Sequence, residues 1–175
     1  MLVATFGITA ISILLFAYVM AIRPWHLQWG ATHLDRVAVL PGDELSPHAP
    51  SQITRAVAVA APPERVWPWV EKIAKDRAAR RRMVIAIERP PQALVLVGAA
   101  DLPRTQAGDE ALDETWTFFL KPVPGATTRV IARLRAASFP SLGTRVKNFF
   151  FWEPAHFLME RKMLLNIKES VEKKS

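Results

Sequence analysis

The sequence contains no cysteine and only seven glycines, none of which forms a phosphate-binding loop. The lack of cysteine excludes disulfide bonds and thiolate metal sites, and it leaves the redox compartment open. The HExxH metal motif and the GxSxG nucleophile motif are also missing. We therefore expect no cofactor and no metal. The sequence gives no catalytic residues to name, and enzymatic activity is left open.

The composition indicates one domain with an anionic partner. A chain of 175 residues, half of them hydrophobic, suits a single domain with an appendage. Its formal charge of +7 favours a phospholipid surface or nucleic acid as partner. No nucleic-acid motif is present, and no aromatic platform adjoins the basic residues. We therefore expect a membrane lipid as partner and no nucleic acid. The sequence does not indicate an oligomeric state.

The first residues form a long apolar run. Residues 2 to 22, LVATFGITAISILLFAYVMAI, contain neither a charge nor a proline. A bilayer core needs about 20 apolar residues of helix, which this run supplies. Arg23, Trp25 and Trp29 follow, and a cation and indoles are typical of a membrane interface. We predict a transmembrane anchor over residues 1–23, with these three side chains at the membrane surface.

Two alternatives to an anchor stay open, a cleaved signal peptide and a buried soluble helix. Val19-Met20-Ala21 resembles a cleavage site, but no Lys or Arg precedes the apolar run, as a signal peptide normally requires. Arg23 and Arg36 follow the run, and the positive-inside tendency then favours a cytoplasmic body. The expectation is a single-pass membrane protein with a cytoplasmic domain.

The remainder of the chain reads as an irregular segment followed by an α+β domain. Residues 24–52 are punctuated by prolines and glycines and predict a juxtamembrane segment with turns. Five alternating, β-branched stretches predict strands over 53–60, 83–88, 93–98, 114–121 and 128–136. Helical spacing predicts helices from Pro63, over 140–152, and from Glu153 to about Lys173.

The predicted hairpin at 114–136 has two different faces. Trp116, Phe118 and Leu120 share one face of the first strand, before a turn at 122–125. On the returning strand Val130, Ala132 and Leu134 share one face, and Arg129, Ile131, Arg133 and Arg135 share the other. This alternation predicts a sheet with one covered side and one solvated side. The last helix carries an apolar stripe over His156, Met159, Met163, Ile167 and Val171.

These segments together resemble the SRPBCC superfamily, the START-like or polyketide cyclase/dehydrase-like proteins. The matching stretches are ITRAVAVAAPPERVWPWV, ALVLVG, TWTFFLKPVPGATTRVIARLRA and EPAHFLMERKMLLNIK. The apolar run before RPWHLQWGAT and LPGDEL is similar to membrane-attached members. The resemblance implies a helix-grip domain over residues 53–175, in which a curved antiparallel sheet grips the long C-terminal helix.

The chain departs from that family pattern after its first helix. The resemblance implies further helix and one or two strands there, but AKDRAARRR at 74–82 leads almost directly to the next strand. We predict that this run continues the helix and ends in a turn before Met83, and whether a cavity then closes is left open. Arg80, Arg81 and Arg82 are candidates for contact with anionic headgroups, or they form a solvated helix end.

The candidate ligand site lies behind the hairpin. Met and aromatic side chains suit a loosely specified apolar ligand, although the same residues can simply fill the core. The predicted cavity lining is Trp116, Phe118, Leu120, Val130, Ala132, Leu134, His156, Met159 and Met163. His156 is the best single polar candidate, since His26, His33 and His48 show no ligand spacing. The acidic cluster Asp109, Glu110, Asp113 and Glu114 is expected to be solvated.

The leading hypothesis is a membrane-anchored domain that binds a hydrophobic small molecule or lipid. The anchor, the apolar hairpin and the broad apolar arc of the last helix support it. One alternative is an enzyme of cyclase or dehydrase type on the same fold, for which no polar constellation is visible. Another is a truncated structural remnant without a ligand.

Overall fold

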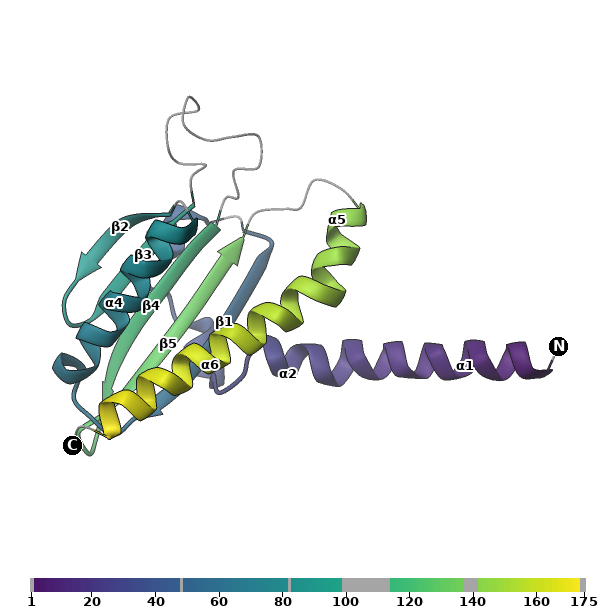
Figure 1. Cartoon of the computed structure of the whole chain (residues 1–175), viewed down its shortest axis with the longest axis horizontal. Helices are drawn as coiled ribbons and strands as arrows, with labels where there is room; N and C mark the ends of the chain where they lie inside the picture. The colour runs from purple at the N-terminus through teal and green to yellow at the C-terminus, as the bar shows by residue number, and fades with distance from the viewer. Residues whose placement is uncertain (1, 48, 82, 99–113, 137–141, 174–175) are drawn as a thin grey trace, which may run out of the picture.

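The chain folds into an antiparallel sheet with two long helices on one face, preceded by an exposed helical rod (Figure 1). The computed structural model describes residues 2–47, 49–81, 83–98, 114–136 and 142–173. The rod is α1 (Leu2–Ala17), η1 (Tyr18–Ile22) and α2 (Arg23–Leu27). The strands are β1 (Ser51–Val59), β2 (Val84–Arg89), β3 (Ala93–Val97), β4 (Glu114–Val123) and β5 (Thr127–Ala136). The remaining helices are α3 (His33–Val37), η2 (Asp43–Leu45), α4 (Pro63–Arg81), α5 (Leu142–Lys147), η4 (Asn148–Trp152) and α6 (Glu153–Glu172).

The five strands pair in the order β1-β5-β4-β3-β2, every pair antiparallel. In the hairpin Trp116 lies opposite Leu134, and Phe118 lies opposite Ala132, so the predicted inner faces of β4 and β5 coincide. The turn is tighter than predicted, because strand pairing extends through Val123 and only residues 124–126 connect the strands. The α+β fold, with a sheet that grips the C-terminal helix, is confirmed.

Helix α4 contains the basic run. Val66, Val70 and Ala74 are fully buried at helical spacing against the sheet. The helix continues to Arg81, and β2 begins at Val84. The prediction that this run extends the first helix and turns directly into the next strand is therefore confirmed.

The outer face of the sheet, opposite α4 and α6, is covered by residues 30–47, here called the outer strap. Leu40 of the strap packs in a buried cluster with Ala56 of β1 and Ile131 of β5. The Thr117 hydroxyl donates to the Pro41 carbonyl oxygen at 3.0 Å. The prediction that this face of the sheet is solvated is therefore wrong. The segment expected to be irregular is wrapped against the sheet, where its backbone meets the arginines of β5.

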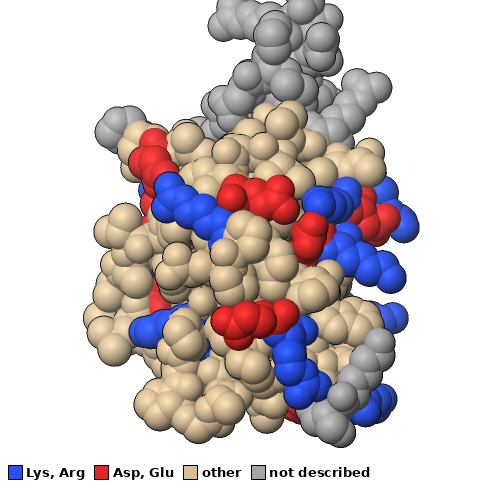
Figure 2. All heavy atoms as spheres, turned by 90° about the vertical axis from the view of Figure 1, so that its left-hand side faces the viewer, with Lys and Arg blue, Asp and Glu red and all other residues tan. Residues whose placement is uncertain are grey.

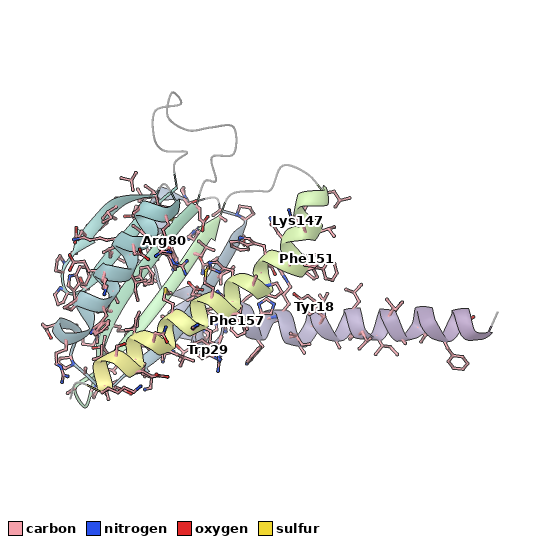
Figure 3. All side chains as sticks on the ribbon, in the orientation of Figure 1. Tyr18, Trp29, Arg80, Lys147, Phe151 and Phe157 are labelled. Carbon is pink, nitrogen blue, oxygen red and sulfur yellow. The ribbon has the colours of Figure 1, made fainter. Side chains whose placement is uncertain are left out.

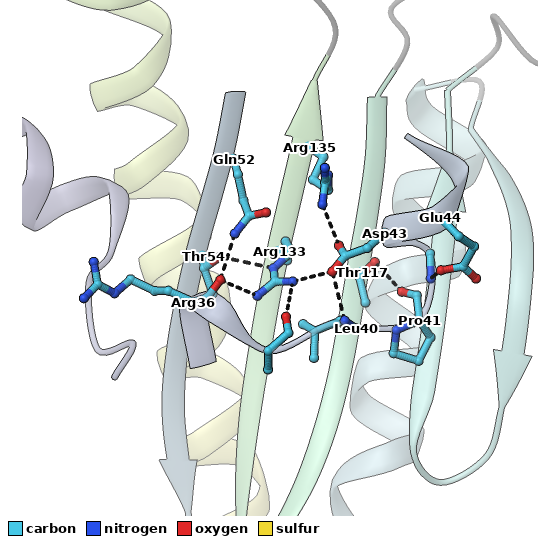
Figure 4. A network of polar contacts seen from close by, with 12 residues as sticks. Arg36, Leu40, Pro41, Asp43, Glu44, Gln52, Thr54, Thr117, Arg133 and Arg135 are labelled. Carbon is cyan, nitrogen blue, oxygen red and sulfur yellow. Dashed lines mark hydrogen bonds and ion pairs between the residues drawn. The ribbon is translucent and has the colours of Figure 1, made fainter. Parts of the chain in front are cut away.

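Arg133 holds the strap by hydrogen bonds to several of its oxygen atoms (Figure 4). Its side chain is 2% exposed and donates to the Asp43 carboxylate at 2.5 Å. It also donates to the carbonyl oxygens of Ala38 at 2.8 Å and of Asp35 at 2.6 Å. Burial lowers the pKa of the Arg133 guanidinium, although the Asp43 carboxylate opposes this effect. Arg133 thus donates hydrogen bonds to a segment that does not pair with the sheet as a strand.

Two glycines allow the strap to approach the sheet closely. Gly30 has φ +71°, and a Cβ there would lie 2.0 Å from the carbonyl oxygen of Ala56. Gly42 has φ +91°, and a Cβ there would lie 2.6 Å from a methyl group of Val95. Both positions combine a left-handed backbone with contact distances that leave no room for a side chain.

Asp35 joins the strap to β5 through charged hydrogen bonds. Its carboxylate accepts from the Thr32 amide at 2.8 Å and from Arg129 Nε at 2.7 Å. Burial by itself raises the pKa of the Asp35 carboxyl, but the hydrogen bonds from Arg129 and Thr32 outweigh it and hold the pKa below its ordinary value. A carboxyl with a lowered folded-state pKa stabilises the fold above its unfolded pKa, and this contribution is lost as the pH falls through the folded pKa.

We expect Asp35→Asn to lower the free energy of unfolding by about 2 kcal/mol at neutral pH, because hydrogen bonds to a charged group are lost. The difference from the parent protein should shrink as the pH falls below about 4, the unfolded pKa of an aspartate. Thermal melting of both proteins across the acid range measures this difference. A difference that stays constant over that range would contradict the assignment.

The helical rod projects from the body with its apolar side chains exposed (Figure 1). Residues Thr5–Leu27 form a helix of 23 residues, in which an apolar window of 18 residues has a mean hydropathy of 2.2 and is 0% buried. By length and composition this helix could cross a membrane. Arg23, at the body end of the rod, pairs with Glu153 at the start of α6 through two hydrogen bonds of 2.7 and 2.9 Å.

Candidate functional site

Eight of the nine predicted lining residues are buried between the sheet and α6. Trp116, Phe118, Leu120, Val130, Ala132, Leu134 and Met163 belong to one buried hydrophobic cluster. His156 is also buried on α6, at 3% exposure. Met159 differs, because it is 39% exposed and the buried stripe of α6 passes through Glu160 instead. These residues pack as the core, and their role as a ligand lining stays a prediction.

A charged cluster lies within this core, formed by Arg55, Trp116, His156 and Glu160. The side chains of Arg55 and Glu160 are 0% and 1% exposed, and they form an ion pair between β1 and α6. Trp116 Nε1 donates to the second carboxylate oxygen of Glu160 at 2.9 Å. Arg55 Nε donates to the His26 carbonyl oxygen at 2.8 Å, which links the cluster to the end of the rod.

The imidazole of His156 lies against the guanidinium of Arg55. Arg55 Nη1 lies 3.1 Å from His156 Nδ1. An arginine carries donors only, so His156 Nδ1 is the acceptor in this contact. Trp152 stacks on this ring at 4.6 Å between centroids. The guanidinium of Arg77, on α4, lies 4.0 Å from the centre of the Trp116 ring and covers it.

The charged cluster is buried among the described residues. Its four side chains are each 3% exposed or less, and general acid–base chemistry requires contact with the reacting atom. Its geometry instead fixes the position of α6 on the sheet. Sequence reasoning identified His156 but missed Arg55 and Glu160. Glu160 lies one helical turn after His156 on the same face of α6, and this spacing could have indicated a polar cluster there.

A groove between α4 and α6 is the more accessible candidate site. It has a volume of about 480 Å³, within the range of roughly 300–1,000 Å³ typical of small-molecule sites. It is lined by Trp69, Lys72, Ile73, Asp76, Arg80, Asn166, Ile167 and Ser170. None of the nine predicted lining residues is among them.

The groove is amphipathic. Trp69 and Ile73 from α4 and Ile167 from α6 form its apolar part, and they also contact or belong to the hydrophobic core. Lys72 and Arg80 add positive charge on the α4 side. Arg80 pairs with Asp76 at 3.0 Å, whereas Lys72 has no ion-pair partner in the described part of the chain. A ligand with an apolar body and an anionic group would match these side chains.

The sequence spacing of the α4 residues in the groove indicates that they lie on one face of the helix. Trp69, Ile73, Asp76 and Arg80 recur at three- or four-residue spacing beside the buried stripe, so they share one helix face. The partners on α6 could not be inferred, because the crossing of the two helices decides which side chains meet.

The predicted membrane-surface residues separate into two places (Figure 3). Arg23, Trp25 and Trp29 lie at the body end of the rod, where both indoles contact Phe157 of α6. Arg80 lies on α4 at the groove. Arg81 is the last residue of α4, and Arg82 lies outside the described residues.

The remaining candidates add no metal site. His33 is exposed and His26 is buried, while His48, Asp109, Glu110 and Asp113 lie outside the described residues. Glu114, expected to be solvated, is instead buried at the start of β4, so that expectation is wrong for this residue. In the part that is described, no group of three or more His, Asp or Glu residues could hold a metal ion. On the side of the body facing away from the rod, basic and acidic side chains are interspersed (Figure 2).

Comparison with known proteins finds similarity only among solved structures. No family model and no curated protein matches the sequence. The Zhui aromatase/cyclase from Streptomyces sp. R1128 is 11% identical over 71% of this chain and 94% of its own, with a TM-score of 0.42. DR_A0006 from Deinococcus radiodurans is 14% identical over 71% of this chain and 100% of its own, with a TM-score of 0.45.

A third similar structure, the Aha1 dimer from Colwellia psychrerythraea, is 12% identical over 67% of this chain and 96% of its own, with a TM-score of 0.40. The α+β fold, a five-stranded antiparallel sheet that grips the C-terminal helix, is established by the chain's own structure. The antiparallel sheet, with α6 packed in the core on its inner face, has the arrangement that the sequence resemblance implied.

Proposed function

We propose that this protein is a membrane-anchored helix-grip domain that binds an amphipathic, anionic small molecule or lipid in the groove between α4 and α6. The observation that carries the proposal is the composition of the groove. An apolar floor of Trp69, Ile73 and Ile167 lies beside Lys72, a cation without an ion-pair partner among the described residues.

The physical chemistry of the groove favours an amphiphile over a purely apolar ligand. Apolar surface on the floor gains free energy when a hydrocarbon displaces water. Lys72 and Arg80 lie close enough to the same space to attract a carboxylate or phosphate group. Asn166 and Ser170 supply further polar groups on the α6 side. Fatty acids and anionic lipids combine these two features.

The anchor would place this domain beside a reservoir of such ligands. The span Thr5–Leu27 has the length and hydropathy of a single membrane crossing. Arg23 and Arg36 follow the apolar run, and the positive-inside tendency then favours a cytoplasmic domain. A single-pass protein with a cytoplasmic body is therefore part of the proposal.

Charge reversal at the groove is expected to weaken binding of a fluorescent fatty acid. We expect Lys72→Glu to raise the dissociation constant roughly fivefold, because one favourable charge contact is replaced by a repulsive one at a partly exposed site. Titration of the full chain in detergent micelles measures this effect. Native mass spectrometry after mild extraction shows whether a lipid remains bound.

Lys75→Glu is the matched control for the groove. This variant has the same charge change on the same helix. Lys75, however, pairs with Glu71 and lies outside the groove. It should leave binding of the fatty acid nearly unchanged. A fatty alcohol, which lacks the anion, should bind both variants equally. The proposal fails if the parent protein binds neither probe, or if the two variants lose affinity for the fatty acid to the same extent.

A further inference from the structure

The segment formed by α5 and η4, residues 142–152, exposes apolar side chains beside positive charge. It is here called the aromatic segment. Its exposed apolar residues are Leu142, Val146, Phe150 and Phe151, the last of them 72% exposed. Arg145 and Lys147 lie in the last turn of α5. A soluble surface rarely presents such a contiguous apolar group without a partner.

The aromatic segment is fixed against the rod by direct contacts. The Tyr18 hydroxyl donates to the Phe149 carbonyl oxygen at 3.0 Å. The Tyr18 ring lies 5.3 Å from the Phe149 ring and 6.1 Å from the Phe150 ring. The ion pair between Arg23 and Glu153 closes the same junction. Figure 3 shows Tyr18 and Phe151 on the same side of the molecule, where the rod leaves the body.

The position of Tyr18 along the rod sets the depth of these contacts. Arg23 is the first charged residue after the apolar run, so it marks the level of the headgroups if the rod spans a bilayer. Tyr18 lies five residues earlier, which is several ångströms deeper along the rod. Phe149 and Phe150 touch Tyr18 and must therefore lie at a similar depth.

We propose that the aromatic segment inserts into the headgroup–acyl boundary of the membrane that holds the rod. The inference rests on the anchor of the proposed function. Its apolar side chains would enter the bilayer to the shallow depth typical of interfacial helices. Arg145 and Lys147 would meet anionic headgroups. Leu158 of α6 and Trp25 of the rod are also exposed apolar side chains, at 64% and 57%.

A bilayer fits this surface better than a second copy of the chain. The contact with Tyr18 lies within the apolar run of the rod, where the surroundings are lipid. Basic residues flanking aromatic ones complement an anionic membrane, whereas two copies would bring like charges together. The aromatic segment and the rod would then form two attachments that fix the orientation of the body.

The lack of native cysteine makes a direct test possible, because one introduced cysteine is a unique labelling site. Phe151→Cys, labelled with a nitrobenzoxadiazole fluorophore, is measured in the full chain in vesicles of phosphatidylcholine and phosphatidylglycerol. We expect blue-shifted emission, severalfold stronger quenching by lipids with a nitroxide near the headgroup than by aqueous iodide, and weaker quenching by a nitroxide at the chain end.

Two further labelled variants separate the possible outcomes. Glu169→Cys, on the exposed side of α6, should be quenched by iodide and not by lipid nitroxides. Ile11→Cys, in the middle of the rod, should be quenched by the deep nitroxide; if it is not, the anchor itself fails. Deep quenching at position 11 with aqueous quenching at position 151 overturns only the present inference. Blue-shifted emission at position 151 without lipid quenching also overturns it, because it indicates a protein contact.

Discussion

Glu160→Ala is expected to lower the free energy of unfolding by about 3–5 kcal/mol, because it leaves the Arg55 guanidinium buried without its counter-ion. Arg55 and Glu160 are almost completely enclosed, so water cannot replace the lost carboxylate. Trp116 Nε1 would lose its acceptor as well. For a chain of this size the loss corresponds to a fall in melting temperature of roughly 10 °C. Thermal melting of the full chain in detergent micelles measures it.

A double replacement separates the ion pair from the packing around it. Arg55→Met together with Glu160→Met removes both charges and keeps two long apolar side chains. We expect it to recover most of the stability, since a buried ion pair is often no better than apolar side chains of similar volume. Glu169→Ala, at an exposed ion pair with Lys173, should change the melting temperature little. Equal losses for Glu160→Ala and Glu169→Ala would contradict the assigned role.

Arg133→Met is expected to destabilise the fold by a similar amount, about 3–5 kcal/mol, but at the opposite face of the sheet. The Asp43 carboxylate would lose a buried cation, and the carbonyl oxygens of Ala38 and Asp35 would lose their donor. The backbone hydrogen bonds within the strap are local, in α3, η2 and turns, and they do not tie it to β5. Hydrogen exchange followed by mass spectrometry should show faster exchange over residues 33–45, with α6 much less affected.

Arg135→Met is the matched control on the same strand. Arg135 is 15% exposed and lies 3.5 Å from the other oxygen of the Asp43 carboxylate. Its loss should cost about 1 kcal/mol, because water can reach the site. If Arg133→Met leaves exchange over the strap unchanged, the strap is held by its apolar contacts rather than by Arg133.

The two buried arginines have a common consequence for function. Arg55 connects β1 to α6 and to the end of the rod, and Arg133 connects β5 to the strap that follows the rod. The rod is therefore joined to both faces of the sheet. A membrane-attached rod would hold the body, and with it the groove between α4 and α6, in a defined orientation to the bilayer.

The sequence by itself determined the strands, the long helices and the inner face of the hairpin, but not the short helices α3 and η2 in the segment expected to be irregular. Alternation of side chains placed Trp116, Phe118 and Leu120 on one side of β4, since successive residues of a strand point to opposite faces. The basic run at the end of α4 was predicted as a helical connection from the same local patterns. The helix of the rod could be predicted from the length and hydropathy of the apolar run alone.

Only the tertiary structure decided the partners of the charged residues and the place of the groove. Arg55 and Glu160 are separated by 105 positions, and no local pattern indicates that they meet. The strap has no periodicity, so its packing over Ile131 and the arginines of β5 was not predictable and the outer face was expected to be solvated. The groove depends on how α4 and α6 cross. Periodicity is a property of neighbouring residues, whereas ion pairs and grooves form between segments that only folding brings together.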